Sequence, residues 1–202
     1  MSFNWSDFWN AIQALAVFAT AIIAFSGLRT WRQQLVGGRK FEIAEATVMT
    51  VYQLRMAVKE IRNPLVFGSE IEDALKDFGD NPTPEQEKAA RFYVTLHRMK
   101  PFRDLITELE MRRIECKVHF EADSEPLLEL SAVFWRDIAW AARELGDDAL
   151  EGGNLTGDKD REKSIRKWRR VIWAGPRGSD EIETKIEREI MKIEEICRPH
   201  LK

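Results

Sequence analysis

The chain has few cysteines and histidines, and this shortage excludes several classes of protein. Among its 202 residues there are two cysteines, Cys116 and Cys197, and three histidines. Two cysteines are too few for a disulfide framework or a zinc cluster. We therefore expect both cysteines to be reduced thiols.

Sequence motifs for metals, phosphates and cofactors are also missing. We find no H-E-x-x-H, no paired E-x-x-H, and no glycine-rich loop of the form G-x-x-x-x-G-K-[ST]. The formal net charge is −3, so the basic excess typical of dedicated nucleic-acid-binding proteins is missing too. The sequence predicts no metal site and no cofactor, and it assigns no nucleophile or general base.

Alternating strand segments, repeats and low-complexity tracts are absent, whereas helical periodicity is frequent. Residues 41–62 have apolar side chains on one helical face, and Pro64 ends that segment. Thr83 followed by Pro84 and Gln86 predicts a capped helix start, and Asp180 predicts another. We expect the helix beginning near Pro126 to lie at the centre of the core and to stop at Gly146. The predicted fold class is all-α: one N-terminal transmembrane helix followed by a cytosolic helical bundle.

One long uncharged run, residues 8–28, predicts the transmembrane helix. Its roughly 21 residues would span about 30 Å as a helix, the thickness of a bilayer's hydrocarbon core. Trp5 and Trp9 lie near the start of the run, and Trp31 lies shortly after its end. These positions correspond to the headgroup level of a bilayer, where indole rings prefer to lie. The alternatives are an internal helix of a soluble bundle and a cleaved signal peptide.

Basic residues follow this run and none precedes it. Arg29, Arg32, Arg39 and Lys40 lie within a dozen residues of its end, so the positive-inside rule places the N-terminus outside and the rest in the cytoplasm. We expect a single-pass protein of a bacterial inner membrane. Its predicted parts are the anchor with its flanks, residues 1–36, and a helical cytosolic domain, residues 37–202, with a hinge at Gly37 and Gly38.

The two faces of the predicted anchor differ in side-chain size. Small and polar side chains recur on one stripe, and bulky ones lie opposite. Such a stripe lets helices approach closely within a bilayer, so we expect a homo-oligomer. The residues of this association stripe are Asn10, Gln13, Val17, Thr20, Ala24 and Gly27.

Two arginine–histidine pairs suggest a catalytic alternative. Arg91 with His97, and Arg113 with His119, match R-x5-H and so resemble HEPN ribonucleases. These are all-helical proteins in which Arg and His meet across a dimer to cleave RNA. The resemblance implies that either pair cleaves RNA; otherwise the histidines lie partly exposed on helices.

A basic segment near the C-terminus carries interleaved tryptophans. Arg166, Lys167, Arg169 and Arg170 could contact phosphate groups of RNA or anionic lipid headgroups, because guanidinium groups pair with phosphates. The alternative is a solvated helix face with its tryptophans in the core.

Three segments, LRTWRQQL, VYQLRMAVKEIRNP and IEEICRPHL, resemble bacterial proteins that have one N-terminal span, a helical cytosolic domain and no assigned activity. In layout the chain is also similar to the membrane accessory protein of Cas13b-type CRISPR systems, which assembles as a pore with a HEPN-like fold. The expected function is a non-enzymatic, membrane-tethered interaction or effector module with an unidentified protein partner. The alternatives are a HEPN-like ribonuclease and an oligomeric membrane pore acting in phage defence.

Overall fold

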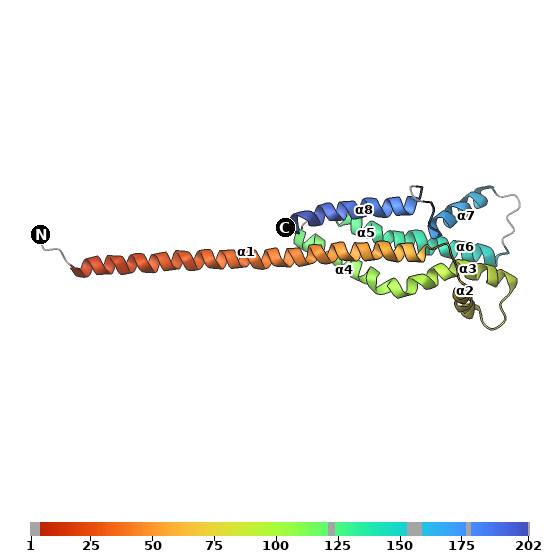
Figure 1. The fold of residues 1–202 in the computed structure, drawn as a ribbon, viewed down its shortest axis with the longest axis horizontal. Helices are drawn as coiled ribbons and strands as arrows, with labels where there is room; N and C mark the ends of the chain where they lie inside the picture. The colour runs from red at the N-terminus through yellow and green to blue at the C-terminus, as the bar shows by residue number, and fades with distance from the viewer. Residues whose placement is uncertain (1–4, 121–123, 153–158, 177–178, 202) are drawn as a thin grey trace. The chain divides into compact units, whose positions relative to one another are not determined.

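The computed structural model describes residues 5–120, 124–152, 159–176 and 179–201, without the side chains of residues 5–8, 10–12 and 14. Across these ranges the regular structure is entirely helical and includes no strand, which confirms the all-α class (Figure 1). A π-helical segment, Val133–Ala139, joins α5 to α6. The α-helices are α1 (Trp5–Ile61), α2 (Gly68–Leu75), α3 (Pro84–Met99), α4 (Arg103–Phe120), α5 (Glu125–Ala132), α6 (Trp140–Leu150), α7 (Lys159–Ile172) and α8 (Glu181–Cys197).

The chain divides into two compact units, Met1–Glu42 and Ile43–Lys202. In the first unit the described residues belong to α1, which stays helical through Gly37 and Gly38. No break in the helix is observed at these glycines, and the hinge stays a prediction. Each glycine costs a helix only about 1 kcal/mol, which the good helix formers on both sides offset.

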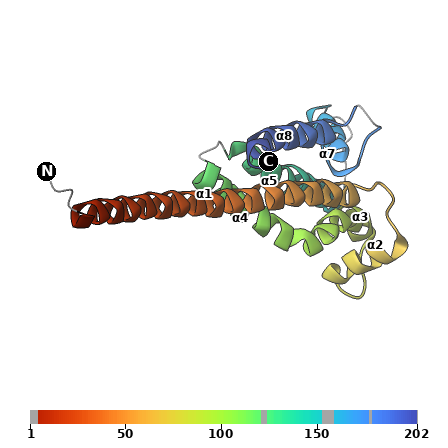
Figure 2. The same ribbon diagram turned by 60° about the vertical axis from the view of Figure 1, so that its left-hand side comes forward.

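The core of the second unit lies between the last part of α1, α4, α5, the π-helical segment and α8. Both views show these elements running alongside one another (Figure 1, Figure 2). The apolar face predicted for the helix after Pro126 lies at the centre of this core, as expected, and so do four isoleucines of α8. The buried side chains include Val51, Leu54, Val58, Leu109, Leu127, Leu130, Phe134, Ile138, Ile182, Ile186, Ile190 and Ile193.

Two helix starts follow from local capping. The Thr83 hydroxyl accepts a hydrogen bond from the Gln86 backbone N–H at 3.3 Å, and the Gln86 side chain accepts one from the Thr83 N–H at 2.7 Å. The Asp180 carboxylate accepts from the backbone N–H groups of Ile182 and Glu183. Both predicted caps are confirmed.

Gly146 does not end a helix, and the prediction that it would was wrong. It is buried within α6, which continues to Leu150. A Cβ at this position would lie 2.6 Å from Cζ of Tyr93. The glycine is therefore explained by the close approach of α3 to α6 rather than by a helix stop.

The predicted membrane span, residues 8–28, lies within α1. Over the residues that the structure describes, no helix is both long enough and apolar enough to cross a membrane. Several side chains of the span, including those of Phe8, Asn10 and Ile12, lie outside the described residues. The transmembrane helix stays a prediction.

Candidate functional site

The most prominent feature of the first unit is apolar surface exposed along α1. Each of the large apolar side chains described between Trp9 and Val36 has more than half of its surface exposed. Exposed apolar patches of this extent mark contacts with a membrane or another protein. The side chains are Trp9, Leu15, Val17, Phe18, Ile22, Ile23, Phe25, Leu28, Trp31, Leu35 and Val36.

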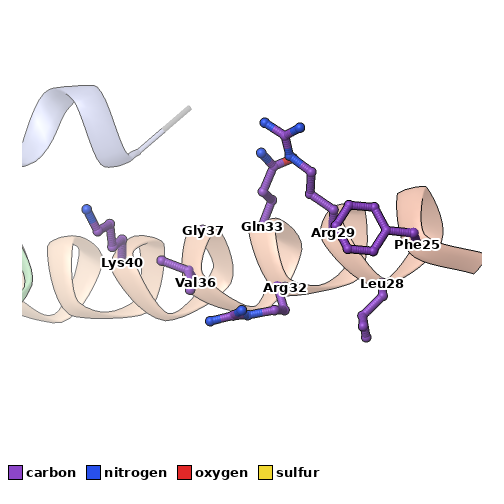
Figure 3. Close-up of a pocket in the computed structure, with 8 residues that line it drawn as sticks. All are labelled: Phe25, Leu28, Arg29, Arg32, Gln33, Val36, Gly37 and Lys40. Carbon is purple, nitrogen blue, oxygen red and sulfur yellow. The ribbon is translucent and has the colours of Figure 1, made fainter. Parts of the chain in front are cut away.

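At the end of the predicted span, apolar and basic side chains share one stretch of α1. They line an open hollow of about 560 Å³ along the helix, formed by Phe25, Leu28, Arg29, Arg32, Gln33, Val36, Gly37 and Lys40. Figure 3 shows Arg29 and Gln33 extending together on one side of the helix and Arg32 on another. Arg29, Trp31 and Arg32, three of the predicted flank residues, are exposed. The side chain of Trp5, the remaining flank residue besides Trp9, is not described.

The association stripe is exposed wherever its side chains are described. Gln13, Val17, Thr20, Ala24 and Gly27 all face outward from α1, and Asn10 lies outside the described side chains. The Thr20 hydroxyl donates to the Ala16 carbonyl at 2.8 Å, so its proton is satisfied within the helix. Among the described residues, no side chain or backbone group forms a hydrogen bond with the Gln13 side-chain amide.

Within a single chain, the arginine and the histidine of each predicted pair bond to other partners or lie exposed, and contact across a dimer stays a prediction. Arg91 is exposed on α3, whereas Nε2 of His97 lies 2.8 Å from Oδ2 of Asp77, a contact that lowers the pKa of the Asp77 carboxyl. Nε of Arg113 donates to Oε2 of Glu110 at 2.8 Å, within α4. In the part of the chain that is described, no hydrogen bond or ion pair joins the members of either pair.

Sequence reasoning missed a buried ion pair between Arg62 and Asp180. Both side chains are 3% exposed, and Nη2 of Arg62 lies 3.0 Å from Oδ1 of Asp180. The guanidinium also donates to the backbone carbonyls of Arg170, Val171 and Trp173, at the end of α7. One side chain thus joins the end of α1, the end of α7 and the start of α8.

A signal for this arginine exists in the sequence. Arg62 stands four residues after Val58, on the helical face that also carries Leu54 and Val51. A charged residue on an apolar face needs a buried partner. Asp180 is 118 residues away, so no local pattern identifies it as that partner.

The basic segment lies on α7 with its tryptophans turned inward. Arg166, Lys167, Arg169 and Arg170 are exposed, and Trp168 is partly buried against the second core cluster. All four basic residues line a cavity of about 1080 Å³, which reaches Trp173 and the start of α8. The predicted cations are therefore brought together at one cavity.

The two cysteines lie together in the core. Both are free and buried, and Sγ of Cys116 lies 3.5 Å from the Thr47 hydroxyl. A hydrogen bond from the Cys197 thiol lowers the pKa of Cys116. Within the described ranges, His, Cys, Asp and Glu side chains nowhere gather in a group of three or more that could hold a metal ion.

Comparison with known protein families, curated proteins and solved structures found no match for this chain.

Proposed function

We propose that the protein is a membrane-tethered, non-enzymatic interaction module of a bacterium, assembled as a homo-oligomer through the first part of α1. One observation carries the proposal: large apolar side chains are exposed on α1 from Trp9 to Val36. At about 25 cal/mol for each Å² of apolar surface removed from water, a helix with such a surface is stabilised by lipid or by a second helix. The bundle of the second unit then serves as the domain that binds a protein partner.

The ends of the apolar stretch support a bilayer as the first partner. Arg29 and Arg32 make no ion pair with described residues, so both are available to headgroup phosphates on the cytoplasmic side. Trp9 and Trp31 are 61% and 57% exposed near the two ends of the run. This distribution fits a single span in the inner membrane with its N-terminus outside.

Matched arginine substitutions test the tether. Ile22 on α1 and Ile114 on α4 are 56% and 58% exposed. Ile22→Arg adds about 2.5–3.5 kcal/mol to the cost of insertion, and Ile114→Arg adds none. After carbonate extraction of membranes, we expect Ile22→Arg to shift to the supernatant while Ile114→Arg and the wild type stay in the pellet. Equal extraction of all three would contradict the proposal.

A HEPN-like ribonuclease is the alternative that one specific contact favours. The hydrogen bond between His97 and Asp77 orients the imidazole, as a general base or acid requires. If this site cleaves RNA, His97→Ala abolishes cleavage by the purified protein and His119→Ala does not. The interaction module predicts no cleavage by the wild type and an intact cellular phenotype in both variants.

An oligomeric pore acting in phage defence is a more specific form of the tethered assembly. It draws support from the exposed Gln13, whose amide has no partner within the described residues. A pore predicts that Gln13→Leu changes ion leakage in liposomes while membrane insertion stays the same. A tether without a pore predicts no leakage from either protein.

A further inference from the structure

A large cavity lies where α7 ends and α8 begins, and basic side chains form much of its wall. Its volume, about 1080 Å³, exceeds what a single phosphate group needs and lies slightly above the usual range of small-molecule sites, about 300–1,000 Å³. Trp173 adds an aromatic surface, and its ring is held against Phe92 with centroids 6.0 Å apart. The basic residues of the wall are Lys163, Arg166, Lys167, Arg169 and Arg170.

The cations of this wall repel one another along the helix. Lys163 and Lys167, and likewise Arg166 and Arg170, are like-charge pairs four residues apart, a spacing that destabilises a helix by a few tenths of a kcal/mol per pair. Among the residues that the structure describes, Arg166 alone of these cations has a carboxylate partner, the exposed Glu162 at 3.4 Å. An anion bound in the cavity would relieve this repulsion.

The buried ion pair adjoins the same cavity through Asp180, which is one of the lining residues. Arg62 binds the last carbonyls of α7 and neutralises Asp180, which also accepts a hydrogen bond from the Gly175 N–H at 2.9 Å. The negative charge of Asp180 therefore does not repel an anion bound in the cavity. Glu181 is the remaining carboxylate that lines the cavity, and it is exposed.

We propose that this cavity binds a small organic phosphate, with Arg166, Lys167 and Arg170 contacting its phosphoryl groups and Trp173 packing against its organic part. Arginine suits this role because its planar fork donates two hydrogen bonds to one phosphate. A soluble phosphate ester and the headgroup of an anionic lipid share the recognised chemistry. The inference stands apart from the membrane tether, since every residue that it uses belongs to the second unit.

Calorimetric titration of the full-length protein in detergent tests the site with two probes, ADP without metal and dihexanoyl phosphatidylglycerol. We expect Arg166→Gln and Arg170→Gln each to raise the Kd about tenfold, because each removes a charge-assisted hydrogen bond. Glu181→Gln should lower the Kd, since it removes a repelling charge. Arg103→Gln, at an exposed arginine of α4 outside the cavity, is the matched control and should leave the Kd unchanged.

Each result bears on the proposal. Binding of ADP with this pattern of variants supports a soluble ligand, and binding of the lipid alone with the same pattern supports a headgroup. The first part of α1 is identical in all variants, so differences between them measure the cavity. Failure of both probes to bind, or a Kd that is the same in Arg166→Gln, Arg170→Gln and Arg103→Gln, would overturn the proposal.

Discussion

Arg62 combines a buried charge with hydrogen bonds to the backbone carbonyls at the end of α7. Its guanidinium has four described partners, Asp180 and three backbone carbonyls. Removing one member of a buried pair leaves the other charge without compensation, which costs about 3–5 kcal/mol. The side chain is therefore central to the stability of the second unit.

Arg62→Met should lower the free energy of unfolding by about 3–5 kcal/mol, measured by urea denaturation with circular dichroism. Arg55→Met is the control, because Arg55 also pairs across to α8, with Glu187, but both side chains are well exposed. We expect that control to lose less than about 1 kcal/mol. Equal losses would show that the buried pair contributes no more than a surface pair.

Gly146→Ala tests the close packing of α3 against α6. The added methyl group would displace the Tyr93 ring, whose hydroxyl donates to Asp147 at 2.6 Å. We expect a net loss of about 1–2 kcal/mol in thermal or urea unfolding, because the strain exceeds the gain in helix propensity. In a Tyr93→Ala background the same change should stabilise by up to about 1 kcal/mol, and a loss in both backgrounds would argue against this contact as the cause.

At the scale of helices, local sequence signals predicted helix starts such as those at Thr83 and Asp180. They did not predict contacts between residues that are far apart in the chain. Thr83 and Asp180 carry their partners within three residues, so their caps are visible in the sequence. Gly146 carries the usual signal of a helix end, but the ring that occupies the space beside it comes from α3. The pattern of apolar residues does not indicate the π-helical segment.

The candidate sites also differ in whether local sequence or long-range contacts determine them. The exposed apolar run and the basic residues of α7 follow from composition and periodicity, so both were predicted. The cavity depends on where α8 begins relative to the end of α7, and that placement depends on Arg62. A pairing between residues so far apart in the chain cannot be derived from one sequence without an alignment.

Cysteine crosslinking in membranes tests the association stripe of α1. Thr20→Cys and Ala24→Cys place a thiol on the stripe, and Ile22→Cys places one on the opposite face as a control. The native cysteines are buried and should not react under mild oxidation. We expect disulfide-linked dimers from the two stripe positions alone, and crosslinking that is strongest at Ile22→Cys would assign the interface to the bulky face.

At the scale of the whole molecule, Asp180 links stability to pH. Burial raises its pKa, but hydrogen bonds from Arg62, Gly175 and Glu183 outweigh this effect and hold the pKa below its usual value. The ionised group thus stabilises the fold above the unfolded pKa of about 3.9, and this contribution is lost as pH falls through the folded pKa.

The free energy of unfolding at pH 5 and pH 3 measures this linkage. The wild type should lose more stability between the two values than Asp180→Asn, which has no carboxyl to protonate at this position. Identical losses in the two proteins would mean that Asp180 does not contribute to the acid sensitivity of the fold.

The mass of the full-length protein in detergent, compared with that of a chain beginning at Arg39, tests the central claim most directly. Light scattering with a correction for bound detergent gives both masses. If the first part of α1 assembles the protein, the full-length form is a defined oligomer and the shortened form, which retains the whole second unit, is a monomer. If both are oligomers of the same order, assembly belongs to the helical bundle and the account is wrong.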